Sequence, residues 1–264
     1  MISAGIDVGS RTTKIVWLDD GQLARAEVFD TGVEPLDRVL NALAASPADS
    51  IVATGYGRRL VGARLPCPVV TEIRACARGA RCLAPDCRSV IDIGGQDTKA
   101  VELAGEGGFG RFEMNDRCAA GTGRFLEVMA RALGYTIEEF AADVDDRPVP
   151  VNSMCTVFAE SEVISLIARG EDRRRIALGL NLATARRVAA MASRIDLRDR
   201  TLFVGGVARN PCMVRALREE LKADLMVPQS PQTAVALGAA LIAAEARCAD
   251  ADQALQSRAQ YQQG

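Results

Sequence analysis

The sequence predicts an α/β protein made of two α/β halves that face a cleft. The first observation is a repeat, because residues 90–101 (VIDIGGQDTKAV) echo residues 6–16 (IDVGSRTTKIV). In both copies an apolar run ends at an aspartate, a turn of small residues follows, and an apolar run resumes after a lysine. This is the pattern of strand, tight turn and strand. The second observation is that a strand meander, helix, strand and helix follow in the same order in each half, with insertions in the second.

The repeated hairpin has the residue types that a phosphate and magnesium site needs. Glycine in the turn lets backbone N–H groups come close to a phosphate. An aspartate at the end of the first strand places a carboxylate at the mouth of the turn, where it can hold a hydrated Mg²⁺. The alternative is two ordinary hairpins with glycine in their turns. The residues that repeat are Ile6, Asp7, Gly9, Thr13, Lys14 and Val16, which return as Ile91, Asp92, Gly94, Thr98, Lys99 and Val101.

Lysine usage favours the phosphate interpretation. Of the 32 Lys and Arg residues, only Lys14, Lys99 and Lys222 are lysines, and the first two occupy matching places in the repeat. A compact ammonium suits a point contact to phosphate better than the planar guanidinium of arginine does. With so few lysines, coincidence is the competing explanation.

The first half is expected over residues 1–84. Apolar runs between turn residues predict strands at 6–8, 14–18, 23–29 and 50–54. Apolar residues at helical spacing, including Val39 and Leu43, predict a helix over 34–46, and a second helix is expected over 72–83. Residues 55–58 are expected to form a glycine-bounded loop, and 66–70 are expected to be extended.

The second half is expected over residues 85–231 and carries two cysteine loops. Thr156 or Ser153 is expected to cap the helix that follows the second loop. The last helix, over 233–245, is expected to return to the first half, which adds about 232–248 to it, and the polar tail beyond about residue 250 is expected to fray. After the second hairpin we expect strands at 109–114, 201–204 and 225–227, and helices at 122–133, 137–142, 157–169, 173–193 and 211–221.

Length and composition exclude several classes of function. With 264 residues, of which 48% are hydrophobic and 25% charged, the chain is typical of a soluble globular protein. A net charge of −2 gives no general attraction to nucleic acid or to an anionic membrane. No apolar run approaches the ~20 residues of a membrane span, and the start leads directly into the first strand without a signal peptide. We therefore expect a cytoplasmic protein.

Histidine is absent, which excludes Ser-His-Asp and Cys-His catalysis, histidine-ligated metals and a haem held by a proximal histidine. Eight cysteines in a cytoplasmic chain are not expected to form a disulfide framework. None occurs as C-x-x-C, so the spacing of zinc ribbons is absent too. Any redox or metal chemistry would therefore depend on cysteine and carboxylate.

Cys118 and Cys155 are the cysteines that the sequence singles out. Each lies in a loop of small residues before a predicted helix, where free N–H groups and the helix dipole stabilise a thiolate. Such thiolates suit a soft metal or an iron–sulfur cluster. Two cysteines do not complete a four-cysteine site, but a symmetric dimer would. The alternative is that both are small buried residues. The cysteines expected to be structural are Cys67, Cys76, Cys82, Cys87, Cys212 and Cys248.

The segment Gly205-Gly206-Val207 is a candidate nucleotide contact. It follows a buried-type strand and offers a flat backbone surface for a base or ribose, and the N-terminus of the next helix favours anions. The phosphate-binding pattern G-x-x-x-x-G-K-[ST] does not occur. The alternative is a turn that only packs a helix against the strand.

Six motifs carry a resemblance to a known family: GIDVGS-x-x-x-K, ATGYGR, VIDIGGQD-x-K, ND-x-CAAGTGRFL, CTVFAESEVIS and GGVA-x-N. From about residue 5 to 243 the chain resembles the activators of 2-hydroxyacyl-CoA dehydratases, a family that includes the ATP-binding subunits of benzoyl-CoA reductases. The resemblance implies two actin/hexokinase-like (ribonuclease H-like) α/β halves around a nucleotide cleft. One departure is the segment 74–79 (RACARG), where relatives often carry a Cys-His pair; partner contacts are therefore expected to differ.

The resemblance implies an ATP-driven electron donor. Its cofactors would be ATP or ADP, Mg²⁺ and one [4Fe-4S] cluster shared by a homodimer, with Cys118 and Cys155 as ligands. Its partners would be an iron–sulfur acyl-CoA dehydratase or reductase component and, as electron source, reduced ferredoxin or flavodoxin. The residues implied to be catalytic are Asp7, Asp92, Gln96 and Asp97. Those implied to bind cofactors are Gly9, Ser10, Thr12, Thr13, Lys14, Gly94, Gly95, Lys99, Gly121, Thr122, Gly123, Gly205, Gly206, Val207 and Asn210.

The expected mechanism is that ATP binding closes the cleft, rotates the helices after the two cysteines and lowers the cluster potential. Hydrolysis would then reset the protein and prevent back-transfer. The alternative from another class is a small-molecule kinase that phosphorylates a sugar or an acid, in which the two loop cysteines would be idle. A third interpretation is a regulatory ATP-binding module without electron transfer.

Overall fold

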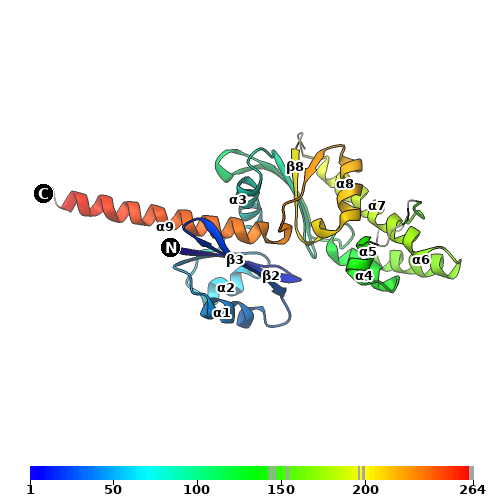
Figure 1. Ribbon diagram of the computed structural model, residues 1–264, viewed down its shortest axis with the longest axis horizontal. Coiled ribbons are helices and arrows are strands. Elements are labelled where there is room, and N and C mark those ends of the chain that lie inside the picture. Colours follow the sequence, from blue (N-terminus) through cyan, green and yellow to red (C-terminus); the bar gives the residue numbers. More distant parts are fainter. Residues whose placement is uncertain (143–144, 146, 153–154, 196, 198–199, 262–264) are drawn as a thin grey trace. The chain divides into compact units, whose positions relative to one another are not determined.

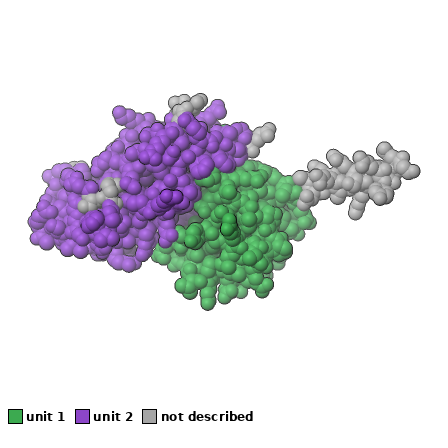
Figure 2. Space-filling view, turned by 180° about the vertical axis from the view of Figure 1, so that it is seen from behind, with its two compact units in different colours: residues 1–82, 233–264 green, residues 83–232 purple. Residues whose placement is uncertain are grey.

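The chain forms two compact units in the computed structural model. One comprises Met1–Cys82 with Thr233–Gly264, and the other comprises Leu83–Gln232; Figure 2 colours them separately. The structure describes residues 1–142, 145, 147–152, 155–195, 197 and 200–261, with the backbone alone for 106 and 248–261. Each unit is built on one β-sheet with helices (Figure 1), which confirms the predicted α/β class.

The sheet of the first unit has the strand order β3-β2-β1-β4. Strands β1 (Ile2–Val8), β2 (Thr12–Asp19) and β3 (Gln22–Asp30) form an antiparallel meander, and β4 (Ser50–Thr54) lies parallel to β1. Side chains alternate across the sheet, so the buried runs of β1 and β2 supply apolar residues to both faces. The meander follows from the short turns, and the parallel strand follows from the helix that precedes it.

Helices cover both faces of this sheet. On one face Ile15 and Trp17 share a core with α1 (Pro35–Ala45) and α2 (Arg58–Arg64), and on the other Val16 and Leu18 contact α9 (Ala234–Tyr261). The first unit also contains most of α3 (Glu72–Leu83). Helix α2 was not predicted because only Val61 of its seven residues is buried, so it shows no apolar periodicity.

The expected fraying of the C-terminal tail is wrong, because α9 continues to Tyr261. Its sequence between Gly238 and Gly264 contains neither glycine nor proline and is rich in alanine, the strongest helix former. In the described part of the chain, no helix combines the length and apolar character needed to cross a bilayer.

The second unit repeats the arrangement with one more strand, in the order β7-β6-β5-β8-β9. Its meander consists of β5 (Ser89–Ile93), β6 (Thr98–Leu103) and β7 (Phe109–Asn115), and β8 (Arg200–Val204) lies parallel to β5. Strand β9 (Asp224–Met226) extends the sheet beside β8. The strand order therefore places the second hairpin beside a parallel strand, as in the first unit.

Among the described residues of this unit, the α-helices are α4 (Gly123–Ala132), α5 (Ile137–Ala142), α6 (Thr156–Ala168), α7 (Arg173–Ala192) and α8 (Pro211–Leu221). Phe125, Leu180 and Met213 represent α4, α7 and α8 in one core with β5. The expected cap of α6 is wrong for Thr156, which is the first helical residue; Cys155 is the N-cap and makes no side-chain cap hydrogen bond. Ser153, the other expected cap, lies outside the described residues.

Glycines allow α9 to approach its neighbours closely. A Cβ built on Gly5 of β1 would lie 2.1 Å from the carbonyl oxygen of Ala236 in α9. A Cβ on Gly238 of α9 would lie 1.8 Å from the carbonyl oxygen of Ala75 in α3. Both distances are shorter than any tolerated contact, so these positions require glycine for α9 to reach the sheet and α3.

Replacing Gly238 by Ala is therefore expected to lower the free energy of unfolding by about 2 kcal/mol or more, because overpacking forces the helices apart. Urea unfolding followed by circular dichroism measures this. Gly105→Ala is the control, since a Cβ there has no atom within 4 Å. Equal stability of Gly238→Ala and the wild type would contradict the close helix contact.

Candidate functional site

The first hairpin holds an aspartate beside a lysine. Asp7 and Lys14 are directly opposite in the β1–β2 register, and Lys14 Nζ lies 3.3 Å from Asp7 Oδ2. Both side chains are largely buried, with 8% of Asp7 and 15% of Lys14 exposed. Around them, Gly9 and Thr12 are half-buried and Ser10 is exposed at the turn. The hairpin thus presents a carboxylate and an ammonium at its mouth, as the repeat predicts.

Thr13 lies on the opposite face of β2 from Lys14. Its hydroxyl is 3.0 Å from that of Thr31, which donates to the carbonyl oxygen of Gly9 at 2.8 Å. This buried pair holds the turn in place, so Thr13 stabilises the hairpin from the face of β2 opposite to Lys14. Its role in nucleotide binding stays a prediction.

The second hairpin repeats the geometry and adds a carboxylate. Asp92 and Lys99 are opposite in the β5–β6 register. Lys99 Nζ lies 3.8 Å from Asp92 Oδ2 and 2.5 Å from Asp97 Oδ2, and the lysine side chain is 3% exposed. Two carboxylates and one ammonium together carry a net negative charge, and carboxylate oxygens are ligands that Mg²⁺ prefers. Gln96 is exposed at the tip of the turn, where it can reach solvent.

A glycine of positive φ stands against the aspartate in each unit, and sequence reasoning did not find this correspondence. Gly55 follows β4 with φ +90°, and Gly205 follows β8 with φ +89°. A Cβ on Gly55 would lie 2.5 Å from Asp7 Oδ1, and a Cβ on Gly205 would lie 2.4 Å from Asp92 Oδ1. The signal was present in the ATGYGR segment, whose glycine directly follows a strand as Gly205 does, but this segment was expected only to form a loop.

The side chain of Asn210 forms hydrogen bonds within the protein. Its Oδ1 accepts from the backbone N–H of Met213 at 3.0 Å as the N-cap of α8, and its Nδ2 donates to Asn181 Oδ1 at 2.9 Å. Asn181 of α7 is fully buried and donates in turn to the carbonyl oxygen of Ala177. Asn210 therefore fixes the start of α8 relative to the turn at Gly205, whereas Gly206 is exposed and Val207 buried.

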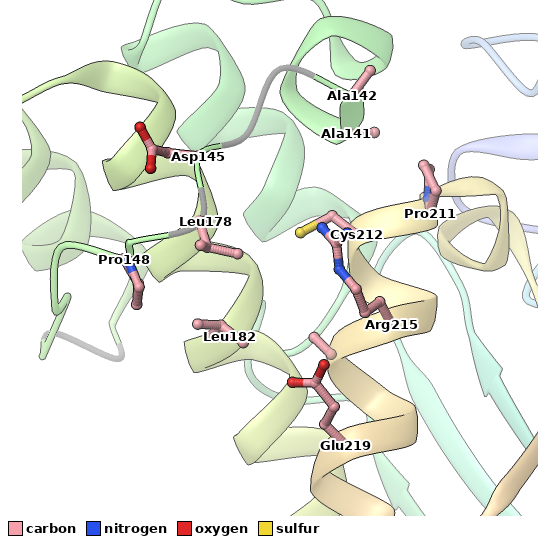
Figure 3. Close-up of a pocket in the computed structure, with 11 residues that line it drawn as sticks. Ala141, Ala142, Asp145, Pro148, Leu178, Leu182, Pro211, Cys212, Arg215 and Glu219 are labelled. Atoms are coloured by element: carbon pink, nitrogen blue, oxygen red, sulfur yellow. The ribbon is translucent and has the colours of Figure 1, made fainter.

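A cavity of about 740 Å³ opens beside the start of α8 (Figure 3). Its walls come from the end of α5, the connector after α5, α7 and one face of α8, as the sticks show. The floor is mainly apolar, and Arg215, Glu219 and Asp145 supply charge. The lining residues are Ala141, Ala142, Asp145, Pro148, Leu178, Leu182, Pro211, Cys212, Arg215, Ala216 and Glu219. Sequence reasoning missed this site because three segments far apart in the chain build it: residues 141–148, α7 and α8.

Cys212 was expected to be only structural, yet its thiol lines this cavity. Burial raises the pKa of the Cys212 thiol, against the opposing effect of a hydrogen bond with Arg215. A thiol with a raised pKa is protonated at neutral pH. Cys212 therefore contributes an uncharged wall to the cavity.

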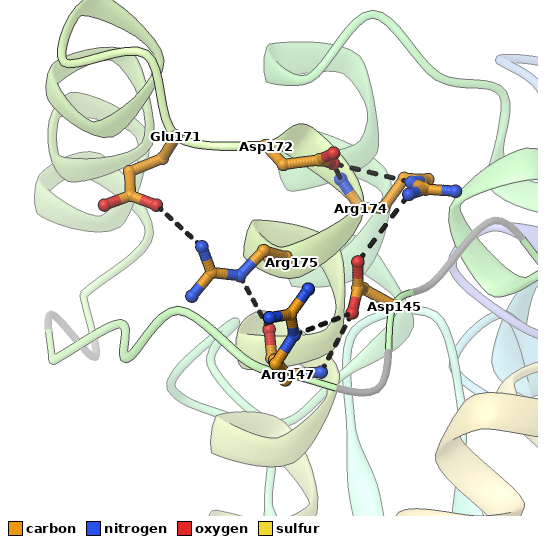
Figure 4. Close-up of polar contacts among 6 residues, drawn as sticks. All are labelled: Asp145, Arg147, Glu171, Asp172, Arg174 and Arg175. Atoms are coloured by element: carbon orange, nitrogen blue, oxygen red, sulfur yellow. Dashed lines mark hydrogen bonds and ion pairs between the residues drawn. The ribbon is translucent and has the colours of Figure 1, made fainter.

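An ion-pair network holds the connector that forms one side of the cavity (Figure 4). Asp145 pairs with Arg174 at 3.6 Å, and Arg175 Nε donates to the carbonyl oxygen of Arg147 at 3.0 Å. Asp172 caps α7 by accepting from the backbone N–H of Arg174 at 2.7 Å. The start of α7 is thereby fixed to the connector, and with it the cavity wall that carries Asp145.

The loop of Cys118 is held by side chains from two elements. Asn115, at the end of β7, donates to the carbonyl oxygens of Cys118 at 2.8 Å and Ala120 at 3.1 Å, and accepts from the Cys118 N–H at 3.3 Å. Arg187 of α7 donates to the Ala120 carbonyl at 3.1 Å. Gly121 and Thr122 are buried, and Gly123 begins α4. Cys118 lies four residues before the N-cap Thr122, so only Cys155 sits directly at a helix start.

The alternative that both cysteines are small buried residues is wrong. Cys118 is half-buried and Cys155 is exposed. Among the residues that the structure describes, no group of three or more cysteines or carboxylates is arranged to hold a metal ion. Of the cysteines expected to be structural, Cys76, Cys87 and Cys212 are buried, whereas Cys82 of α3 is exposed. The side chain of Cys248 lies outside the described part.

Comparison with known proteins gives consistent relatives. The chain matches the BadF/BadG/BcrA/BcrD ATPase family over residues 4–243. It is 45% identical over 258 residues to the activator of lactoyl-CoA dehydratase of Anaerotignum propionicum, a match covering 93% of this chain and 98% of that protein. It is 31% identical over 263 residues to one of the subunits of benzoyl-CoA reductase of Thauera aromatica, covering 91% of this chain and 92% of that protein.

Solved structures agree. The activator of 2-hydroxyisocaproyl-CoA dehydratase from Clostridium difficile, solved with bound ADPNP, superposes with a TM-score of 0.89 at 37% identity, covering 96% of this chain and 98% of that chain. A ROK family glucokinase from Streptomyces griseus shares the fold, with a TM-score of 0.59 at 19% identity over 93% of this chain and 100% of that chain. The predicted actin/hexokinase-like fold is confirmed, and the chain belongs to the BadF/BadG/BcrA/BcrD ATPase family.

Proposed function

We propose that this protein hydrolyses ATP to drive one-electron transfer to an acyl-CoA dehydratase. The observation that carries the proposal is the pair of accessible cysteines, Cys118 and Cys155, in the same unit as a hairpin with carboxylates and a lysine. A kinase of this fold has no use for two such thiols. The 45% identity to an activator of lactoyl-CoA dehydratase supports a dehydratase as partner over a ring reductase, to which the identity is 31%.

The two hairpins would hold the phosphates of ATP and Mg²⁺. Asp92 and Asp97 offer oxygen ligands beside Lys99, and the net negative charge of these three side chains suits a divalent cation. Lys14 and Lys99 would neutralise phosphate charge, and Gln96 or Asp97 would orient the attacking water. Mg²⁺ would complete its coordination with phosphate oxygens and water, as it commonly does.

The cavity beside α8 would take the adenosine. Its lining begins at Pro211, the first residue of α8 and five residues after Gly206, and its volume of about 740 Å³ exceeds the need of one nucleoside. The apolar side chains of Leu178 and Ala216 in the lining suit a purine face, and Arg215 and Glu219 offer polar contacts. The buried Asn210–Asn181 pair would keep the start of α8 in position for the ribose.

Cys118 and Cys155 would hold a [4Fe-4S] cluster jointly with a second copy of the chain. Two thiols per chain fit a cluster on a two-fold axis, and thiolate is the usual ligand of such clusters. Next to Cys155, α6 exposes the apolar side chains of Val157, Phe158, Ile164 and Ile167, which a second copy would cover. A bound cluster would supply the electron. The loops around Cys118 and Cys155 would hold the two thiolates in position, and the hairpin residues would hydrolyse ATP.

Reduced ferredoxin or flavodoxin would return the electron after each turnover. We place the system in the cytoplasm, because all seven cysteines whose side chains are described are free thiols, as a reducing compartment favours. Hydrolysis would make transfer to the dehydratase directional.

Replacing Asp92 by Asn should lower the rate of ATP hydrolysis at least about 100-fold, because the variant loses a Mg²⁺ ligand at the reacting phosphate. Phosphate release measures the rate, and iron content should stay unchanged. Asp37→Asn, at an exposed position of α1, is the matched control and should hydrolyse ATP normally. Turnover retained by Asp92→Asn would remove this carboxylate from the site.

Replacing either Cys118 or Cys155 by Ser should abolish iron binding in protein prepared without oxygen, while ATP binding persists. Iron and sulfide assays with the solution mass test this, and the wild type should hold about four irons per dimer. Cys82→Ser changes another exposed cysteine and should keep its iron. A full iron–sulfur spectrum in Cys118→Ser would exclude that ligand, and an iron-free wild type after reconstitution would favour the kinase alternative.

Filling the cavity should weaken nucleotide binding. Ala142 is exposed and lines the cavity, so Ala142→Trp should occupy it without disturbing the core and raise the Kd for MgADP by about tenfold or more. Isothermal titration calorimetry measures the Kd, and Ala142→Ser is the control that leaves the cavity open. An unchanged Kd in Ala142→Trp would place the adenosine elsewhere.

A further inference from the structure

The turn of the second hairpin is joined by hydrogen bonds to the helix that follows the Cys118 loop. The N–H groups of Gly123 and Arg124, at the start of α4, donate to the carbonyl oxygens of Gly94 at 2.9 Å and Gly95 at 2.7 Å. The first N–H groups of a helix have no acceptor within the helix, so the turn supplies it. A Cβ on Gly123 would lie 3.0 Å from the Gly94 oxygen, so any larger residue at this position would require the turn to shift slightly away from α4.

A second connection runs through Thr98, the first residue of β6. Its hydroxyl donates to the carbonyl oxygen of Gly121 at 2.6 Å, and the residue is 1% exposed. Thr98 directly follows Asp97, the carboxylate that hydrogen-bonds with Lys99. One buried hydroxyl therefore links the charged end of the hairpin to the Cys118 loop.

Hydrogen bonds hold the Cys118 loop rigid, so that its residues move together when one of them is displaced. Asn115 makes three hydrogen bonds to the loop, and Arg187 makes one from α7. Within the loop, the Thr122 hydroxyl donates to the Ala119 carbonyl at 2.7 Å. A shift of Gly121 thus cannot be absorbed inside the loop and reaches Cys118.

We propose that Thr98 is a positioning residue that transmits nucleotide occupancy of the second hairpin to the Cys118 loop. This inference rests on the proposed function, in which this hairpin binds the phosphates. Phosphate binding draws the backbone N–H groups of the turn inward, and the carbonyls of the same turn carry α4 with them. The Thr98 hydroxyl adds the direct link to Gly121, so that the thiol loop and the phosphate turn change together.

The test compares hydrogen–deuterium exchange of the full chain with and without MgADPNP. In the wild type, the nucleotide should slow amide exchange in residues 116–124. In Thr98→Val, which loses the hydroxyl but keeps the shape, that slowing should fall by about fivefold, the effect of one net hydrogen bond. The affinity for MgADPNP should change by less than about twofold, since the Thr98 hydroxyl is buried and donates to Gly121.

Thr184→Val is the matched control, because Thr184 is equally buried but its hydroxyl donates to the Leu180 carbonyl within α7 and not to the loop. It should retain the wild-type slowing. If Thr98→Val unfolds, Thr98→Ser and Thr98→Ala form a second pair, of which only the serine variant should keep the effect.

Undiminished slowing in Thr98→Val, or equal slowing in the serine and alanine variants, would overturn the role of the hydroxyl. A wild type that binds MgADPNP without any change in 116–124 would overturn this inference and leave the proposed function standing. A wild type that binds no nucleotide would overturn the ATPase proposal, and the inference with it.

Discussion

Each unit depends on one constraint: a buried aspartate held beside a lysine across a tight hairpin. Directly opposed residues of an antiparallel pair carry their side chains on the same face, so the register brings the pairs together: Asp7 with Lys14, and Asp92 with Lys99. Isolated buried charge is costly and is tolerated only with a partner. The neighbouring parallel strand must then be followed by glycine, Gly55 or Gly205, because any Cβ there would meet the carboxylate. Lysine, register and glycine are therefore required together, and the sheet order places them together twice.

In the second unit, the turn proposed to bind phosphate and the loop that carries Cys118 pack on one core. The turn at Gly94 is an acceptor for the start of α4, and the Cys118 loop that precedes α4 is braced from β7 and α7. The same α7 supplies Asn181, which fixes the N-cap of α8, and the cavity wall at Leu178. A rigid, close-packed interior transmits small displacements instead of absorbing them. Under the proposed function, this arrangement lets a nucleotide bound at the turn of the second hairpin act on Cys118 without touching it.

Sequence periodicity predicted the elements whose burial follows a simple pattern. The predicted ranges of α5 and α8 agree with the structure, and those of the strands differ by a few residues. Helix α2 was not predictable because only one of its seven residues is buried, which leaves no apolar periodicity. The end of α9 differs from the prediction because polar residues predict fraying, whereas they also form a regular helix here. The cavity beside α8 was not predictable, since no local pattern marks segments that meet only after folding. For the same reason, the sequence predicts only a structural role for Cys212 and not its place in the cavity lining.

The sequence by itself determined the two hairpins, the family and the two cysteines worth attention, because each is written in residues adjacent along the chain. Local spacing suffices where chemistry needs a turn, a carboxylate and a lysine within a few residues of one another. Only the tertiary structure decided which side chains act at a distance. It turned Asn210 toward Asn181, left Cys155 exposed beside apolar residues of α6, and set the Thr98 hydroxyl on Gly121. These contacts join residues from separate elements, and the packing of helices on the sheet, which no single segment encodes, determines them.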